Sequence, residues 1–157
     1  MAEKKVSSCV IIYDPTKKTM IAAHPTGRPW KNKDGSPKTG VFTLLKGELD
    51  SGEDMYHAAI REIEEESGLK LEKSKLKYLG HYKYIEYKDL EMFYYEMEDV
   101  DLKKLKCSSK FEGQDGKFYP ELNGFINLVY PEEKKYLFFC LQKVLDKIEQ
   151  DHPDLFS

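Results

Sequence analysis

The chain has 157 residues and a formal net charge of −3, with a sequence pI of about 5.9. The acidic balance excludes a protein that coats nucleic acid through a broad basic surface, and the length fits a single domain over residues 1–157. Cys9, Cys107 and Cys140 are odd in number and widely spaced, which excludes a disulfide framework and a zinc site.

No stretch approaches the roughly 20 apolar residues that a membrane helix needs. The first residues also lack the layout of a secretory signal. We therefore expect no membrane partner, free thiols and a cytoplasmic location.

The first part of the chain alternates apolar runs with turns. Residues 9–13 and 20–23 are apolar and flank Asp14-Pro15 and a polar stretch, which predicts a β-hairpin. Residues 25–40 hold three of the seven prolines and three of the ten glycines, which predicts a loop. Residues 41–45 are apolar again and predict a third strand.

A helix is expected next. Ser51 is its predicted N-cap, Asp54 follows three residues later as in a capping box, and Gly68 is its predicted left-handed stop. The expected core face has a spacing of four residues: Met55, Ala59 and Ile63.

Aromatic and β-branched residues then predict a second hairpin, with strands over residues 76–87 and 90–97 around a turn at 88–89. Residues 101–117 are polar and contain glycine, which predicts a loop. Residues 125–130 predict a last strand.

The C-terminal segment predicts an amphipathic helix after Pro131, with Glu132 and Glu133 in its first turn. Its apolar positions share one face: Leu137, Leu141, Val144, Leu145 and Ile148. This order of elements predicts the α/β class, with a mixed β-sheet covered by helices.

The predicted central helix carries the clearest chemical signal of the chain. Glu62 and Glu66 are four residues apart with Glu65 between them, so all three carboxylates project from one helical face. Like charges at this spacing repel, costing a few tenths of a kcal/mol per pair. A divalent cation would offset that repulsion, because Mg²⁺, Mn²⁺ and Ca²⁺ prefer hard oxygen ligands.

The stretch from Gly47 to Leu69 resembles the signature of the Nudix hydrolases at every specified position. Those positions are Gly47, Glu53, Arg61, Glu62, Ile63, Glu65, Glu66, Gly68 and Leu69. The resemblance implies the Nudix α/β/α sandwich, with a mixed β-sheet between helices. It also implies metal-dependent hydrolysis of a pyrophosphate bond in a nucleoside diphosphate-linked substrate.

The resemblance further implies roles for the signature residues. Glu62, Glu65 and Glu66, with Gly47, would form the site of Mg²⁺, with Mn²⁺ as the alternative ion. The implied catalytic set is Glu62, Glu65, Arg61 and Glu53, in which Arg61 orients a glutamate and Glu53 is its partner.

The general base has two possible origins. In some members of the family it is the glutamate that matches Glu62, and in others it comes from a loop outside the signature. Loop candidates for an extra base or metal ligand are Glu112, Asp115 and Glu121, and for each the alternative is a plain surface carboxylate.

The basic loop of residues 25–40 resembles a stretch in a subgroup of small Nudix proteins predicted to act on nucleotides. Arg28 and Lys31 could meet phosphate oxygens, and Trp30 could stack on a base. An equal alternative is a solvated loop with Trp30 against the core. Lys46, just before Gly47, is a separate candidate for a phosphate contact.

The substrate class is indicated only by a family marker. Tyr87 lies eighteen residues after Leu69, which favours a dinucleoside polyphosphate, although Tyr82 and Tyr84 in the same segment are equally explained as one strand face. Nucleoside triphosphates and ADP-ribose are the first alternatives, and diphosphoinositol polyphosphates and capped RNA are further ones.

A non-catalytic nucleotide-sensing Nudix domain is the alternative of another class, disfavoured because every signature carboxylate is present. The expected partner is a small nucleotide, and a homodimer is left open.

Overall fold

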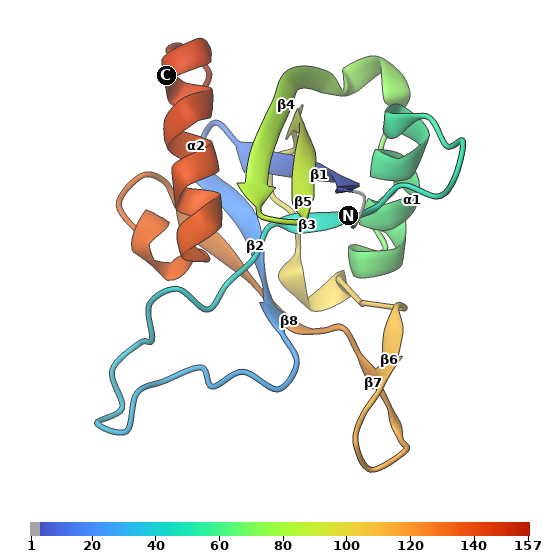
Figure 1. The fold of residues 1–157 in the computed structure, drawn as a ribbon. Helices are drawn as coiled ribbons and strands as arrows, with labels where there is room; N and C mark the ends of the chain where they lie inside the picture. Colours follow the sequence, from blue (N-terminus) through green and yellow to red (C-terminus); the bar gives the residue numbers. More distant parts are fainter. Residues whose placement is uncertain (1–3) are drawn as a thin grey trace.

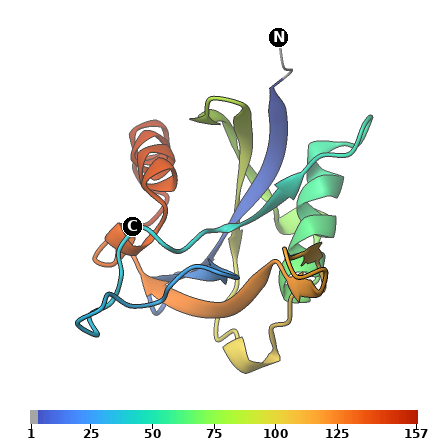
Figure 2. The same cartoon turned by 60° about the horizontal axis from the view of Figure 1, so that its bottom comes forward.

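The computed structural model describes residues 4–157, and Figures 1 and 2 show a sheet with helices on both faces. The strand order is β4-β5-β1-β2-β8, with β3 also paired to β1. Their bounds are Lys77–Ile85, Lys88–Glu96, Lys5–Asp14, Thr19–Pro25 and Leu122–Val129, with β3 at Leu45–Glu48. Since β1 and β5 are parallel and the other pairs antiparallel, the sheet is mixed.

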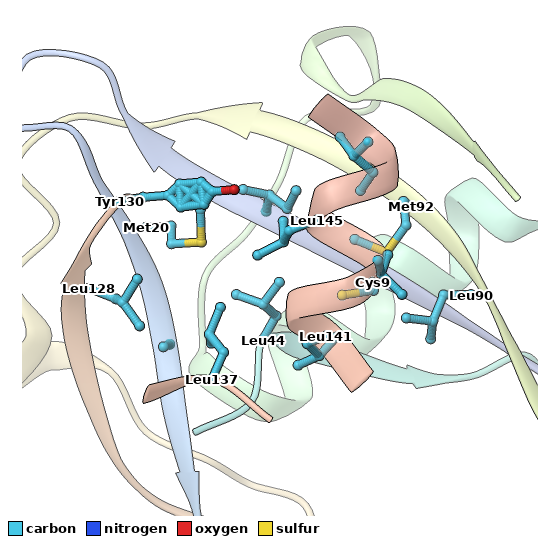
Figure 3. Packing of buried hydrophobic residues seen from close by; sticks show 14 of the residues in the cluster. Cys9, Met20, Leu44, Leu90, Met92, Leu128, Tyr130, Leu137, Leu141 and Leu145 are labelled. Atoms are coloured by element: carbon cyan, nitrogen blue, oxygen red, sulfur yellow. The ribbon is translucent and has the colours of Figure 1, made fainter. Parts of the chain in front are cut away.

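Two helices cover the sheet, α1 (Met55–Ser67) and α2 (Phe139–Asp151). Alternate residues of β1 point to opposite faces: Val10 belongs to the core cluster that includes Ala59 and Ile63 of α1, and Cys9 to the cluster that includes Leu141 of α2. Figure 3 shows the α2 cluster at close range. The predicted α/β/α arrangement with a mixed central sheet is confirmed.

Several local predictions are confirmed as well. Tyr13 pairs with Met20 in the first hairpin. Pro25 still belongs to β2, and residues 26–40 form the predicted loop, which projects from the body in Figure 1. Gly68 ends α1 with φ 83°, a left-handed conformation that glycine adopts readily.

The third strand and the start of α1 lie later in the chain than predicted. Residues 41–44 make only single bridges, because Thr43 pairs with Ala23 rather than with β1, and β3 begins at Leu45. The helix begins after Asp54, whose side chain accepts a hydrogen bond from the His57 amide. The prediction that Ser51 caps this helix is therefore wrong.

The second hairpin turns one residue pair earlier than predicted. Ile85 pairs with Lys88, so residues 86–87 form the turn. The predicted turn at residues 88–89 is wrong because both residues extend β5 in the parallel ladder, where Lys5 pairs with Lys88.

The C-terminal helix begins at Phe139, not after Pro131. Residues 134–136 form a single 3₁₀ turn, and the chain then runs extended because the Phe138 amide donates to the Phe42 carbonyl. Leu137 is buried, but it precedes the helix.

Residues 101–117 are not one loop. They contain a 3₁₀ turn at Leu102–Lys104 and strand β6 (Lys110–Glu112), which pairs with β7 (Phe118–Pro120) in a separate ribbon. Cys9, Cys107 and Cys140 are free. Within residues 4–157 no helix has the length and apolar character needed to cross a bilayer.

Candidate functional site

The carboxylates of α1 face a pocket of about 380 Å³. Glu62, Glu65 and Glu66 line one side of it, as their helical spacing predicts. Glu121, which directly precedes β8, lines the same pocket. Glu48, the last residue of β3, lines it as well. Five carboxylates from three parts of the chain therefore converge on one space.

The remaining lining residues include two cations and two hydroxyls, at Lys46, Lys88, Ser7 and Ser109. Sequence reasoning missed Ser7, Glu48, Lys88 and Ser109. The only sequence signal for Lys88 was its place next to Tyr87, and nothing local marked the two serines.

Gly47 is a glycine because Glu62 occupies the space above it. A Cβ at residue 47 would lie 1.9 Å from Cδ and 2.0 Å from Oε2 of Glu62. Any side chain at residue 47 would therefore displace the end of the Glu62 side chain, and glycine lets the Glu62 carboxylate lie directly on strand β3.

Arg61 is held by a network of carboxylates. Its Nε and Nη2 atoms donate to the two oxygens of Glu53, each at 2.8 Å. Nη1 donates to Oε1 of Glu62 at 2.8 Å and lies 3.4 Å from both oxygens of Glu65. Such a bidentate Arg–carboxylate pair is strong and geometrically specific, and it lowers the pKa of Glu53 far below its usual value.

Glu66 is buried, with 7% of its surface exposed. Its Oε1 accepts a hydrogen bond from the Lys46 amide at 2.8 Å. Burial raises its pKa to about 8, and the negative charges of Glu62 and Glu121 act in the same direction. Burial is also the main cause of the raised pKa of Glu62.

This donor set fits a hard divalent cation. The lining carboxylates outnumber the two lysines beside them, and the charges of Glu62 and Glu121 add to the burial that raises the pKa of Glu66. In residues 4–157 no three acidic, His or Cys side chains already stand around one point as ligands. Glu62 and Glu65 are both directed at Arg61, whose Nη1 lies 2.8 Å from Oε1 of Glu62 and 3.4 Å from the Glu65 carboxylate.

The structure leaves most of the predicted substrate-binding residues outside this pocket. Trp30 stacks on His24 with ring centroids 3.9 Å apart, and Arg28 lies over the Phe138 ring. Lys31 lines a different, apolar pocket together with Trp30. Of the predicted cations, Lys46 alone lines the carboxylate pocket.

Tyr87 and the other loop carboxylates also lie outside the pocket lining. Tyr87 is 59% exposed at the tip of the β4–β5 hairpin. Glu112 is exposed on β6, and the Asp115 carboxylate accepts a hydrogen bond from the Tyr119 hydroxyl. Of the three candidate loop carboxylates, only Glu121 lines the same pocket as the carboxylates of α1.

Comparison with known proteins adds a family and a fold. A family model described as the NUDIX domain matches residues 3–121. A 17.7 kDa protein from the e-segB intergenic region of Enterobacteria phage T4 is 35% identical over 99 residues, which are 58% of this chain and 66% of that protein. The chain thus matches just under two thirds of that relative's length.

Solved structures share the fold at low identity. A bifunctional NMN adenylyltransferase/ADP ribose pyrophosphatase from Francisella tularensis, complexed with AMP and a Mn ion, matches with a TM-score of 0.64 and 11% identity over 96% of this chain and 43% of that chain. The MutT protein of Methanosarcina mazei Go1 matches with a TM-score of 0.60 and 12% identity over 96% of both chains. Because the domain model spans most of the sequence and its signature residues meet at one pocket, the chain belongs to the NUDIX domain family.

Proposed function

We propose that the protein hydrolyses a pyrophosphate bond in a nucleoside diphosphate-linked substrate and requires a divalent metal ion. The observation that best supports this is the convergence of Glu62, Glu65 and Glu66 with Glu121 on one pocket. Oxygen donors of this kind suit Mg²⁺ and Mn²⁺. The cations Lys46 and Lys88 in the same lining would attract a phosphate chain.

The chain's own residues would arrange the reacting groups. Arg61 donates a hydrogen bond to Oε1 of Glu62, and Oε2 of that carboxylate lies over Gly47. Arg61 therefore acts as a positioning residue, itself held by Glu53. When bound, a divalent ion neutralises charge on the phosphates and lowers the pKa of coordinated water.

Glu62 and Glu121 are the two candidates for the general base. Both line the pocket, and the charge of Glu121 contributes to the raised pKa of Glu62. A base must stand within hydrogen-bond reach of the proton that it removes. If Glu121 is the base, Glu121→Gln should lower kcat much more than it weakens metal binding.

A dinucleoside polyphosphate is the favoured substrate. Tyr87 is exposed at the hairpin tip and directly precedes Lys88, which lines the pocket. ADP-ribose is the second substrate to test, since a protein of similar fold is described as an ADP ribose pyrophosphatase and was solved with AMP and Mn. Nucleoside triphosphates are the third.

The test is a chromatographic product analysis with Mg²⁺ and, separately, Mn²⁺. Wild-type protein is incubated with diadenosine tetraphosphate, ADP-ribose and nucleoside triphosphates. Glu65→Gln should lower turnover by orders of magnitude while thermal unfolding is unchanged. Glu64→Gln is the matched control, because Glu64 lies on the same helix but is exposed to solvent.

Nucleotide binding without any product in either metal would instead favour a sensing domain. Equal activity of the Glu65 and Glu64 variants would remove Glu65 from the catalytic set.

A further inference from the structure

The β6–β7 ribbon is attached directly to the carboxylate pocket. At its base the Glu121 amide donates to the Ser109 carbonyl at 2.9 Å, and both residues line the pocket. Ser108 fastens the ribbon to α1, because its amide and hydroxyl donate to the Glu65 carbonyl at 2.7 and 3.0 Å. Figure 1 shows the ribbon projecting from the body below α1.

One face of this ribbon is in register with two residues that line the pocket. In β6 and β7, Phe111 pairs with Tyr119, and Ser109 with Glu121 is the hydrogen-bonded pair two residues nearer the base. Ser109 and Glu121 lie just outside the two strands, with Glu121 in a bend, but their hydrogen bond keeps the register of the Phe111–Tyr119 pair. Side chains two residues apart in this register share a face, which assigns Phe111 and Tyr119 to the face of the pocket-lining pair. The rise of a strand puts them about 7 Å farther out.

The two rings are held in position. Their centroids are 6.1 Å apart, and the Tyr119 hydroxyl donates to the Asp115 carboxylate. A Cβ on Gly113 would lie 2.8 Å from the Tyr119 ring, so the ribbon is shaped around that ring. The pair stabilises the ribbon across its two strands. Neither aromatic belongs to the two core clusters, however, and Phe111 is 39% exposed, so its ring is accessible to a ligand.

We propose that Phe111, supported by Tyr119, is a stacking subsite for a nucleobase of the substrate. This inference rests on the proposed function: the phosphate chain would lie among the carboxylates and lysines of the pocket, and the base would reach the ribbon. An exposed aromatic ring offers a π-face to any base. The subsite therefore favours substrates that carry a nucleobase, but it does not distinguish one nucleobase from another.

The experiment compares a substrate that carries bases with one that carries none. Diadenosine tetraphosphate and phosphoribosyl pyrophosphate are assayed with the wild type, Phe111→Ala and Phe118→Ala. Phe118 is the matched control, because it is 67% exposed on the same ribbon but one residue out of phase with Tyr119, on the opposite face.

We expect Phe111→Ala to raise KM for diadenosine tetraphosphate by roughly 5- to 150-fold, the range for losing one stacked base. Its kcat should change little, because stacking acts equally in ground and transition states. KM for phosphoribosyl pyrophosphate should be unchanged. Phe111→Tyr should keep the wild-type KM for diadenosine tetraphosphate, whereas Phe111→Leu should raise it.

Equal effects of Phe111→Ala and Phe118→Ala, or an equal loss on both substrates, would overturn the subsite. If the wild type hydrolyses neither compound, the proposed reaction fails, but the subsite can still be tested by calorimetric titration of each variant with ATP and Mg²⁺. Weaker binding in Phe111→Ala than in Phe118→Ala would then support stacking. Equal binding, or no binding by the wild type, would overturn it.

Discussion

Replacing Gly47 by alanine should separate activity from stability. Gly47 has no left-handed backbone conformation, so alanine brings no backbone strain. Its Cβ, however, would lie 1.9 Å from Cδ of Glu62, whereas ordinary contacts begin at 3.4 Å. The Glu62 carboxyl group must therefore move by about 1.5 Å, the difference between 3.4 and 1.9.

A misplacement of about 1 Å at a reacting centre can cost about 100-fold in rate. We therefore expect kcat/KM to fall by at least about 100-fold, which corresponds to about 2.7 kcal/mol of activation free energy. The free energy of unfolding should fall by only about 1 kcal/mol, because the clashing atoms end a flexible side chain at the pocket rim.

The assay measures hydrolysis of the best substrate beside urea unfolding for the wild type, Gly47→Ala and Gly35→Ala. Gly35 is the control because it has φ 87° in the 25–40 loop and no atom near its missing Cβ. Its replacement should cost about 1 kcal/mol of stability through backbone strain and leave kcat/KM unchanged. Full activity of Gly47→Ala would refute the proposal that the position of Glu62 is critical.

Three further predictions concern packing and charge. Trp30→Ala should lower the free energy of unfolding by about 2 kcal/mol in urea titrations, because the ring stacks on His24; a raised KM for nucleotides would instead support the substrate role. Glu66→Gln should abolish hydrolysis, yet in the same titrations it should stabilise the EDTA-treated protein at pH 7 by on the order of 1 to 3 kcal/mol. The reason is that the Glu66 pKa is about 8 in the folded protein and 4.5 as its ordinary value, so between these pH values ionisation of Glu66 favours the unfolded state. An unchanged free energy of unfolding would contradict the burial of this carboxyl group. His81, whose pKa two carboxylates raise, should stabilise the fold by less than about 1 kcal/mol below pH 6.5 and lose that contribution as pH rises through its folded pKa. Unfolding of His81→Ala should thus differ from wild type at pH 6 and match it at pH 9.

Local features of the chain were predictable because they depend on residues close in sequence. The spacing of Glu62, Glu65 and Glu66 places them on one helical face wherever the helix packs. Gly68 ends that helix because a left-handed residue is needed there. The alternation along β1 assigns its two faces in the same way.

Boundaries were less predictable, because several local signals competed. Ser51 and Asp54 are both favourable N-cap residues. Asp54 is the N-cap in the structure, because the chain is still in a turn at Gly52, where φ is 75°. The short strand β6 carries no strong pattern, so residues 101–117 gave no sign of a ribbon.

By itself the sequence determined the family signature, the carboxylate face of α1 and the succession of the main strands and helices along the chain. Tertiary structure alone decided that Glu121 joins that face, that Glu66 is buried, and that Trp30 packs on His24. The physical reason is distance along the chain. Helical and strand periodicity relate residues a few positions apart, whereas the pocket joins Ser7 to Glu121 through sheet pairing and helix packing that no local pattern encodes.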